Sequence, residues 1–275
     1  MKQIRFTKMT GSGNDFIIID NRKKSISIKN LKSFITKVCS RRLSIGADGV
    51  IFIEKSSRAD FKWRFFNSDG SVAEMCGNGG RCVARYAFTK RIAGKSLCFE
   101  TIAGLIRAEM KGERVKIQLT EPNNLMLGIK LRISGKEREL NFINTGVPHV
   151  VHFVKNLDSC PVEELGRGIR YHKKFSPAGT NVNFLEHSKG SFLRIRTYER
   201  GVEGETLACG TGSVASVLVA SALGKVSSPC SITPQSGETL KVYFDRDVKG
   251  FHNVYLEGEA RFVFDGVMKE EAWKY

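Results

Sequence analysis

The chain of 275 residues lacks several features that would define its class. Its apolar runs are far too short to cross a bilayer, which excludes a helical membrane protein. No apolar signal region is present near Met1, because residues 1–6 lead straight into strand-like sequence. Acidic residues are scarce, 28 against 44 basic ones, for a net charge of +16. We therefore expect a basic cytoplasmic protein without a membrane partner.

The cysteines also lack the usual pairings. The seven are scattered and odd in number, with no Cys-x-x-Cys and no nearby His pair. This argues against a disulfide framework, structural zinc and a dedicated thiol oxidoreductase. No glycine-rich loop ends in Gly-Lys-Ser/Thr, and no βαβαβ alternation frames one, so P-loop and Rossmann nucleotide sites are disfavoured. We expect no metal and no cofactor.

The excess of basic residues is not concentrated in one part of the sequence. Lys and Arg are spread along the chain with only short clusters, such as residues 22–24. No basic helix and no basic-aromatic motif of the RNA-binding kind is found. We interpret the charge as a solvated surface that attracts anionic metabolites, and expect no nucleic-acid partner. A polyanion partner is the minority alternative.

One short phrase occurs twice, Cys-Gly-Asn-Gly from Cys76 and Cys-Gly-Thr-Gly from Cys209. Each precedes a predicted helix, over residues 81–90 and 213–223. A thiol at a helix N-terminus has a lowered pKa, because unpaired N–H groups and the helix dipole favour the thiolate. Two equivalent thiols indicate a pair facing one ligand, whereas two buried structural cysteines are the plain alternative.

The repeat extends beyond these phrases. Further segments recur in the same order at offsets of 132 or 133, and Asn14 falls opposite Val147. We predict a duplication with an N-terminal domain over 1–121, completed by a returning strand within 263–275, and a C-terminal domain over 122–262. The boundary is placed at residues 121–124. Two related domains predict a ligand site in the cleft between them.

The expected fold is α+β, with each helix packed against a curved, mixed or antiparallel sheet. Period-two or apolar stretches predict strands at 3–8, 15–20, 49–54, 60–66, 97–101, 105–110, 115–119, 139–143, 150–154, 182–186 and 192–198, and at 260–268. Further helices are predicted near 31–38 and 161–170.

Paired thiols suit inversion at a carbon that bears hydrogen. A thiolate removes the proton on one face and a thiol supplies one on the other, without a cofactor. Two helix N-termini on the α-carboxylate would stabilise the charge that develops, in a site closed from water. This chemistry is an amino-acid racemase or epimerase reaction.

The chain resembles the diaminopimelate epimerases, cofactor-independent enzymes that interconvert LL- and meso-diaminopimelate. The matching segments span nearly the whole sequence: residues 10–16, 66–70, 75–82, 148–149, 179–182, 198–201 and 205–212. The resemblance implies two pseudo-symmetric domains, each a helix wrapped by a curved sheet, and a homodimer. The related proline racemases carry Cys-Gly-His in the first motif, so Asn78 favours the diaminopimelate branch.

Site residues follow from the same resemblance. It implies Cys76 and Cys209 as the acid–base pair, and the backbones of Gly77, Asn78, Gly210 and Thr211 as the cradle for a carboxylate. It implies substrate contacts from Asn14, Asn67, Asn181, Glu199 and Arg200. Taken singly, each of these Asn residues is equally typical of a turn. Glu199 and Arg200 are equally typical of a structural ion pair. His149 is placed near the site without a catalytic role.

Two positions depart from the family pattern. Val147 stands where well-known bacterial members carry Asn, and Gly49 where they carry Gln. One amide contact to the substrate is therefore expected to be missing, and a weak side activity on glutamate follows as a hypothesis. An epimerase for another amino acid on the same fold is the alternative function, and a basic binding protein on a retired scaffold is a disfavoured third.

Overall fold

The protein folds as two compact units. The structure, a computed structural model, describes residues 3–24, 26, 28–187 and 192–275. Unit 1 comprises Met1–Ile117 with Glu259–Tyr275, and unit 2 comprises Gln118–Gly258. Within the described residues no helix is long and apolar enough to cross a membrane.

Unit 1 is built on a mixed sheet with two helices. Its strands pair in the order β18–β1–β2–β3–β4–β6–β7–β8, and the β2–β3 and β4–β6 pairs are parallel while the others are antiparallel. The elements are β1 (Gln3–Gly11), β2 (Asn14–Asp20), α1 (Leu31–Val38), β3 (Gly49–Glu54), β4 (Phe61–Asn67), β5 (Val72–Ala73), α2 (Gly77–Thr89), β6 (Ser96–Thr101), β7 (Gly104–Lys111), β8 (Arg114–Gln118), β18 (Arg261–Lys269) and the 3-10 turn η2 (Glu270–Ala272).

Unit 2 repeats this arrangement. Its strands pair in the order β9–β10–β11–β12–β13–β15–β16–β17, again with the third and fifth pairs parallel. The elements are β9 (Asn123–Ile133), β10 (Lys136–Asn144), β11 (Pro148–Phe153), α3 (Val162–Arg170), η1 (Lys173–Phe175), β12 (Asn181–His187), β13 (Phe192–Glu199), β14 (Gly204–Thr206), α4 (Gly210–Ala222), β15 (Cys230–Thr233), β16 (Leu240–Asp247) and β17 (Gly250–Glu259). The predicted duplication and the α+β class are confirmed.

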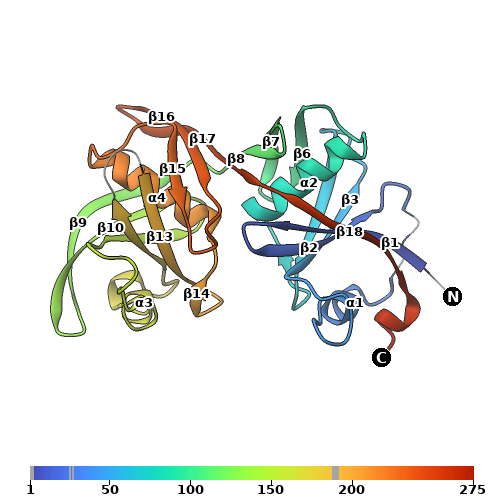
Figure 1. Cartoon of the computed structure of the whole chain (residues 1–275), viewed down its shortest axis with the longest axis horizontal. Coiled ribbons are helices and arrows are strands. Elements are labelled where there is room, and N and C mark those ends of the chain that lie inside the picture. The colour runs from blue at the N-terminus through green and yellow to red at the C-terminus, as the bar shows by residue number, and fades with distance from the viewer. Residues whose placement is uncertain (1–2, 25, 27, 188–191) are drawn as a thin grey trace. The chain divides into compact units, whose positions relative to one another are not determined.

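The last strand of the chain completes the first unit. Strand β18 pairs antiparallel with β1, with Gln3 opposite Lys269, so the red end of the chain lies beside the blue beginning (Figure 1). In unit 2 the equivalent place beside β10 is taken by β9, which directly precedes β10 in the chain. One structural repeat is thus continuous in sequence and the other is closed by a distant strand.

Burial explains the positions of the helices. Residues 16–19 and 50–53 are at most 1% exposed, so β2 and β3 are covered on both faces, as parallel neighbours usually are. Helix α1 packs its Phe34, Ile35 and Val38 against one face of these strands. Helix α2 contacts β1, β2, β3 and β7. Its counterpart α4 is buried all round from Gly212 to Ser221, which is the pattern of a central helix.

Several sequence-based boundaries were wrong or incomplete. Helices α2 and α4 begin at Gly77 and Gly210, not at residues 81 and 213, because a sulfur cap and burial outweigh the low helix propensity of glycine. Strand β9 begins at Asn123, inside the segment predicted as a boundary, and was not predicted. Strands β5, β14, β15, β16 and β17 were also missed.

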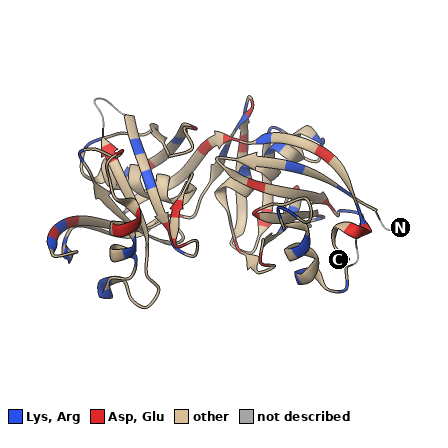
Figure 2. Ribbon diagram, turned by 60° about the horizontal axis from the view of Figure 1, so that its bottom comes forward, with Lys and Arg blue, Asp and Glu red and all other residues tan. Residues whose placement is uncertain are grey.

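The positive charge is unequally divided. Residues 1–117 and 259–275 carry 27 Lys and Arg against 14 Asp and Glu, whereas residues 118–258 carry 17 against 14. Basic residues nevertheless occur throughout both units (Figure 2).

Candidate active site

Cys76 caps the N-terminus of α2. Its backbone is extended, with φ −147° and ψ 119°, and its Sγ accepts a hydrogen bond from the Gly79 N–H at 3.4 Å. The first intrahelical bond runs from the Gly80 N–H to the Cys76 carbonyl. The helix therefore leaves the Gly77 and Asn78 N–H groups at its open end. The side chain of Cys76 is half-buried.

Cys209 has the same geometry on α4. Its backbone has φ −116° and ψ 111°, and its Sγ accepts from the Gly212 N–H at 3.4 Å, the same distance as in unit 1. The Thr211 hydroxyl lies 3.5 Å from this sulfur. The Thr145 hydroxyl donates to the Thr211 carbonyl at 3.2 Å and holds the first turn of the helix. Two thiols thus occupy equivalent helix caps, each at the N-terminus of a central helix.

Four of the other five thiols have environments that favour the protonated form. Burial raises the pKa of Cys39 to about 12 and that of Cys230 to about 11. Burial also raises the pKa of Cys98 and of Cys160. These four cysteines behave as structural or inert thiols.

The unit 1 amides form a connected group. The Asn78 side-chain amide donates to Asn14 Oδ1 at 2.5 Å, and the Asn14 amide donates to Asp48 Oδ2 at 3.0 Å. Asn78 is 4% exposed and Asn14 is half-buried. The structure therefore brings the two predicted substrate contacts together beside the start of α2.

Asn67 and Gly49 lie opposite each other in the β3–β4 register. The Asn67 amide donates to the Ser71 hydroxyl at 3.0 Å within the turn to β5, and its side chain is exposed. A Cβ on Gly49 would lie 2.5 Å from the Phe66 carbonyl oxygen and 2.6 Å from the Phe65 ring. This backbone has no room for the Gln that the family pattern suggests at position 49.

The predicted distal contacts of unit 2 are also assembled. The Asn181 amide donates to the Pro148 carbonyl at 3.1 Å, and Asn181 Oδ1 accepts from the Arg200 backbone N–H at 2.8 Å. Glu199 Oε2 accepts from the Thr206 hydroxyl at 2.9 Å, and burial raises the pKa of Glu199. The Arg200 guanidinium donates to the Ala178 carbonyl at 3.2 Å. Glu199 and Arg200 thus have separate partners and form no ion pair with each other among the described residues.

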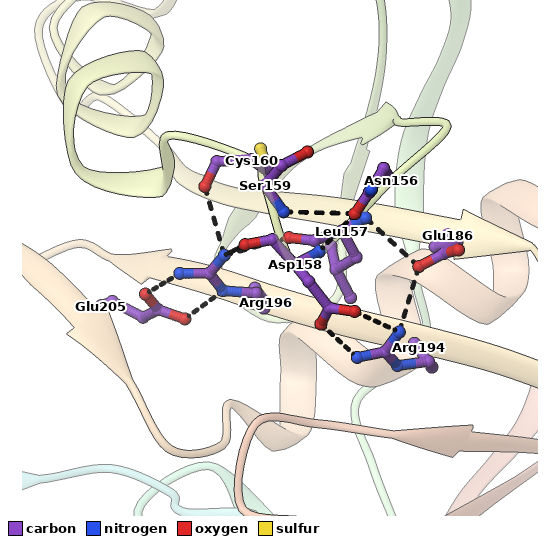
Figure 3. Close-up of polar contacts among 9 residues, drawn as sticks. All are labelled: Asn156, Leu157, Asp158, Ser159, Cys160, Glu186, Arg194, Arg196 and Glu205. Atoms are coloured by element: carbon purple, nitrogen blue, oxygen red, sulfur yellow. Dashed lines mark hydrogen bonds and ion pairs between the residues drawn. The ribbon is translucent and has the colours of Figure 1, made fainter.

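An arginine clamp fixes the strand that carries Glu199 and Arg200. Arg196 on β13 makes two parallel hydrogen bonds to Glu205, at 2.7 and 2.6 Å, and also donates to the Leu157 and Cys160 carbonyls (Figure 3). Bidentate pairs of this kind restrict orientation strongly. The clamp ties β14 to β13 next to Thr206, the residue that holds the Glu199 carboxylate. Arg194 ties the same loop through Asp158.

A buried polar group lies below the Cys209 cap. His149 and Asn183 are fully buried, and the Asn183 amide donates to His149 Nδ1 at 3.2 Å, which places the histidine proton on Nε2. Burial, with a smaller effect from the charge of Arg200, lowers the pKa of His149 to about 3, so the ring is neutral. A Cβ on Gly212 would lie 2.3 Å from Asn183 Oδ1, so only glycine fits there.

The structure brings Asn14 to Asn78 at the start of α2, and Asn181 to the backbone of Arg200 in unit 2. Val147 is half-buried in the turn before β11, where its carbonyl accepts from the Thr145 N–H. Sequence analysis missed supporting residues that contact the predicted ones: Asp48, Arg81, Thr145, Asn183 and Thr206. Arg81 lies within the matching segment 75–82. Nothing else in the sequence indicated a role for it. Among the described residues, no group of three His, Cys, Asp or Glu side chains is arranged to hold a metal.

Solved structures of low sequence identity share the fold. A Bacillus anthracis phenazine biosynthesis protein of the PhzF family matches with a TM-score of 0.76 at 19% identity, over 98% of this chain and 100% of that one. A probable proline racemase from Agrobacterium radiobacter K84 matches with a TM-score of 0.71 at 13% identity, over 97% of this chain and 92% of that one.

Other proteins have a much higher sequence identity to this chain than these solved structures have. The family model for diaminopimelate epimerase matches residues 6–125 and 141–263. The diaminopimelate epimerase of Hydrogenobaculum sp. (strain Y04AAS1) is 49% identical over 96% of this chain and 98% of its own length. That of Aquifex aeolicus (strain VF5) is 45% identical over 99% of this chain and 100% of its own length. The chain therefore belongs to the diaminopimelate epimerase family.

Proposed function

We propose that this protein interconverts LL- and meso-diaminopimelate, with Cys76 and Cys209 as the two acid–base groups and without a cofactor. The product serves lysine and peptidoglycan precursor biosynthesis. The observation that carries the proposal is the matched geometry of the two thiols. Each caps a central helix and accepts one N–H bond at 3.4 Å from the glycine three residues ahead.

The proposed step balances with these groups alone. One sulfur, as thiolate, takes the α-proton, and the electron pair of the broken C–H bond is delocalised into the carboxylate. The other sulfur, as thiol, gives its proton to the opposite face of the same carbon. The configuration is inverted and the two sulfurs have exchanged protonation states. Proton exchange with water restores the starting form.

The helix caps supply the stabilisation this step needs. The N–H groups of Gly77 and Asn78, and those of Gly210 and Thr211, precede the first intrahelical bonds. A carboxylate placed there would receive backbone donors and the positive ends of the helix dipoles. Charge developing on it would then be stabilised by groups fixed before the reaction. We propose that both caps serve one α-carboxylate.

The second amino-carboxylate of the substrate is assigned to the distal residues. Arg200 suits the carboxylate and Glu199 suits the ammonium, with Asn67 and Asn181 as further contacts. Asn181 supports this assignment because its Oδ1 holds the Arg200 backbone at 2.8 Å. His149, neutral and buried, is proposed to support the site without exchanging protons.

Deuterium exchange tests the proposed activity. The protein is incubated with LL-diaminopimelate in deuterated water without pyridoxal phosphate, and α-hydrogen exchange is followed together with formation of the meso isomer. We expect both. Exchange on another amino acid but not on diaminopimelate would favour the alternative, an epimerase of different specificity on the same fold.

We expect slow racemisation of glutamate beside efficient epimerisation of diaminopimelate. A buried polar group left without its partner costs about 1–3 kcal/mol, and Val147 imposes no such penalty on a shorter ligand. Arg200 would hold the side-chain carboxylate of glutamate. The Val147→Asn variant should raise the preference for diaminopimelate, measured as the ratio of kcat/KM values. Absence of glutamate exchange under conditions where diaminopimelate turns over freely would refute this specificity hypothesis.

We also propose a homodimer that uses β18. This strand pairs with β1 along one edge and exposes Val263, Phe264 and Val267, at 55%, 48% and 52%. Phe264 and Val267 line a hollow of about 490 Å³ that also includes Leu43. An exposed apolar edge strand is a template for pairing, and two copies related by a two-fold axis would cover it.

The Val267→Lys variant should convert the dimer to a monomer. A lysine in each copy would be buried in the apolar contact and lose solvation. Light scattering after size-exclusion chromatography measures the mass. Val248→Lys, at a fully exposed valine in unit 2, is the matched control and should leave the mass unchanged. A monomeric wild-type protein would contradict the proposal.

The cell compartment is proposed from the thiols. Both proposed acid–base cysteines, Cys76 and Cys209, must remain reduced to work. The cytoplasm keeps thiols reduced, whereas secreted compartments do not. We therefore assign the reaction to the cytoplasm, with a small-molecule substrate as the partner.

A further inference from the structure

A relay of side chains crosses the unit 1 half of the candidate site. Arg81 donates to Asn78 Oδ1 at 3.0 Å, Asn78 donates to Asn14 Oδ1, and Asn14 donates to Asp48 Oδ2 at 3.0 Å. Every donor points the same way along the chain of bonds. The relay therefore runs from a guanidinium at one end to a carboxylate at the other, with two amides between them.

The guanidinium end is rigid. Arg81 has 0% exposure and belongs to α2, the helix capped by Cys76. It also donates to the Ser12 hydroxyl at 2.7 Å and to the Glu259 carbonyl at 3.2 Å. These bonds fix the plane of the guanidinium. The group that donates to Asn78 thus has one orientation.

The carboxylate end is also fixed. Asp48 Oδ2 accepts from the Asp15 backbone N–H at 3.1 Å as well as from Asn14, and Asp48 Oδ1 accepts from Arg41 at 2.7 Å. Burial alone would raise the pKa of the neighbouring Asp15, but bonds from Arg41 and Lys8 lower it to about 2. The cluster around Asp48 is therefore held by charges that persist at neutral pH.

Unit 2 does not repeat the relay. At the offsets that relate the halves, Asn14 corresponds to Val147, Asn78 to Thr211 and Arg81 to Val214, while Asp48 corresponds to Thr180. None of these four side chains is an amide or a charged group. The relay is consequently a feature of the Cys76 half alone and not a general requirement of the fold.

The relay determines which hydrogen-bond donors of the two amides remain for a ligand. Each amide oxygen already accepts a bond and each NH2 group has one of its two hydrogens engaged, so one N–H per amide remains. Donation from a cation to the Asn78 oxygen strengthens the remaining N–H of that amide as a donor. Amides fixed in this way can each donate the remaining N–H to a carboxylate.

We propose that Arg81 and Asp48 are positioning residues that fix the amides of Asn78 and Asn14 as donors to a substrate carboxylate. This inference rests on the proposed function of the same site. Arg81 and Asp48 do not touch the substrate in this scheme. They act through the two amides, so their effect should vanish when the amide is absent.

A double-mutant cycle tests this dependence. Asp48→Ala, Asn14→Ala and the double variant are compared with the wild type by diaminopimelate α-hydrogen exchange. Asp48→Ala should lower kcat/KM about tenfold, mainly through KM, because the Asn14 amide is then free to rotate. In the Asn14→Ala background the same change should cost less than about twofold, since coupled residues are non-additive.

Control variants distinguish a failure of the relay from a failure to fold and from a failure of the proposed function. Arg22→Ala removes an exposed ion pair with Asp20 elsewhere in unit 1, outside the relay, and should keep the wild-type KM. If Asp48→Ala does not fold, Arg81→Lys with Asn78→Ala forms the second cycle, because the bonds of Arg81 come from two separate nitrogens, Nε and Nη2, which a single ammonium nitrogen cannot replace. Independent, multiplying effects of the two substitutions would overturn the relay. A wild-type protein inactive on diaminopimelate would instead overturn the proposed function.

Discussion

Replacing Cys76 or Cys209 by alanine should abolish epimerisation while each unit remains folded. Each change removes the acid or base on one face of the α-carbon, and general acid–base groups contribute about 10²–10⁴-fold each. The structural cost is small, because loss of a helix cap costs about 1 kcal/mol. Initial rates from LL- and from meso-diaminopimelate, with circular dichroism for folding, measure both effects.

Cys98 provides the matched control. It lies on β6, is partly exposed and has a pKa raised by burial, so Cys98→Ala should retain wild-type turnover. Serine variants are less decisive, because a hydroxyl in a preorganised site can still pass a proton. Near-normal turnover by either alanine variant would refute the two-thiol mechanism.

Mild oxidation should inactivate the protein completely, and a thiol reductant should restore it. Two sulfurs that address one α-carbon can come within disulfide range when no substrate separates them, since a disulfide requires Cα atoms about 4.4–6.8 Å apart. The two thiols then lose two protons and pass two electrons to the added oxidant. Activity is measured before and after reduction, and peptide mapping identifies the bond.

The expected link is Cys76 to Cys209. The Cys209→Ala variant should not form it and serves as the control for oxidation at other thiols. A link between Cys76 and Cys82 would contradict the proposed site. Cys82 is fully buried in α2, which disfavours that outcome.

The two cysteine caps could be predicted from sequence because their signals are local. A Cys followed by small residues and an apolar run defines a helix start without reference to the rest of the chain, and the repeat doubled that signal. The first turns of both helices were placed too late, since glycine propensity is a local rule that capping and burial override. Strand β9 was missed although Leu125, Leu127, Ile129, Leu131 and Ile133 alternate with other residues, because the segment follows directly on residues interpreted as the domain boundary.

The polar partnerships could not be predicted in the same way. Asp48 and Arg81 belong to different elements, and only the tertiary fold brings them to the Asn14 and Asn78 amides. The hydrogen-bond partner that the structure gives a predicted site residue can also change the role assigned to that residue. Asn67 bonds within its own turn, as a turn residue would, while Asn181 supports the Arg200 backbone.

The pairing of β18 with β1 bears on how the chain is made. A ribosome completes residues 118–258, all of unit 2, before it adds the strand that closes unit 1. Domains usually fold in order from the N-terminus during synthesis. Here we expect the order to be reversed, with unit 2 reaching its final form while the β1 edge of unit 1 is still open. A released chain truncated before Arg261 should therefore protect unit 2 from protease and leave unit 1 sensitive.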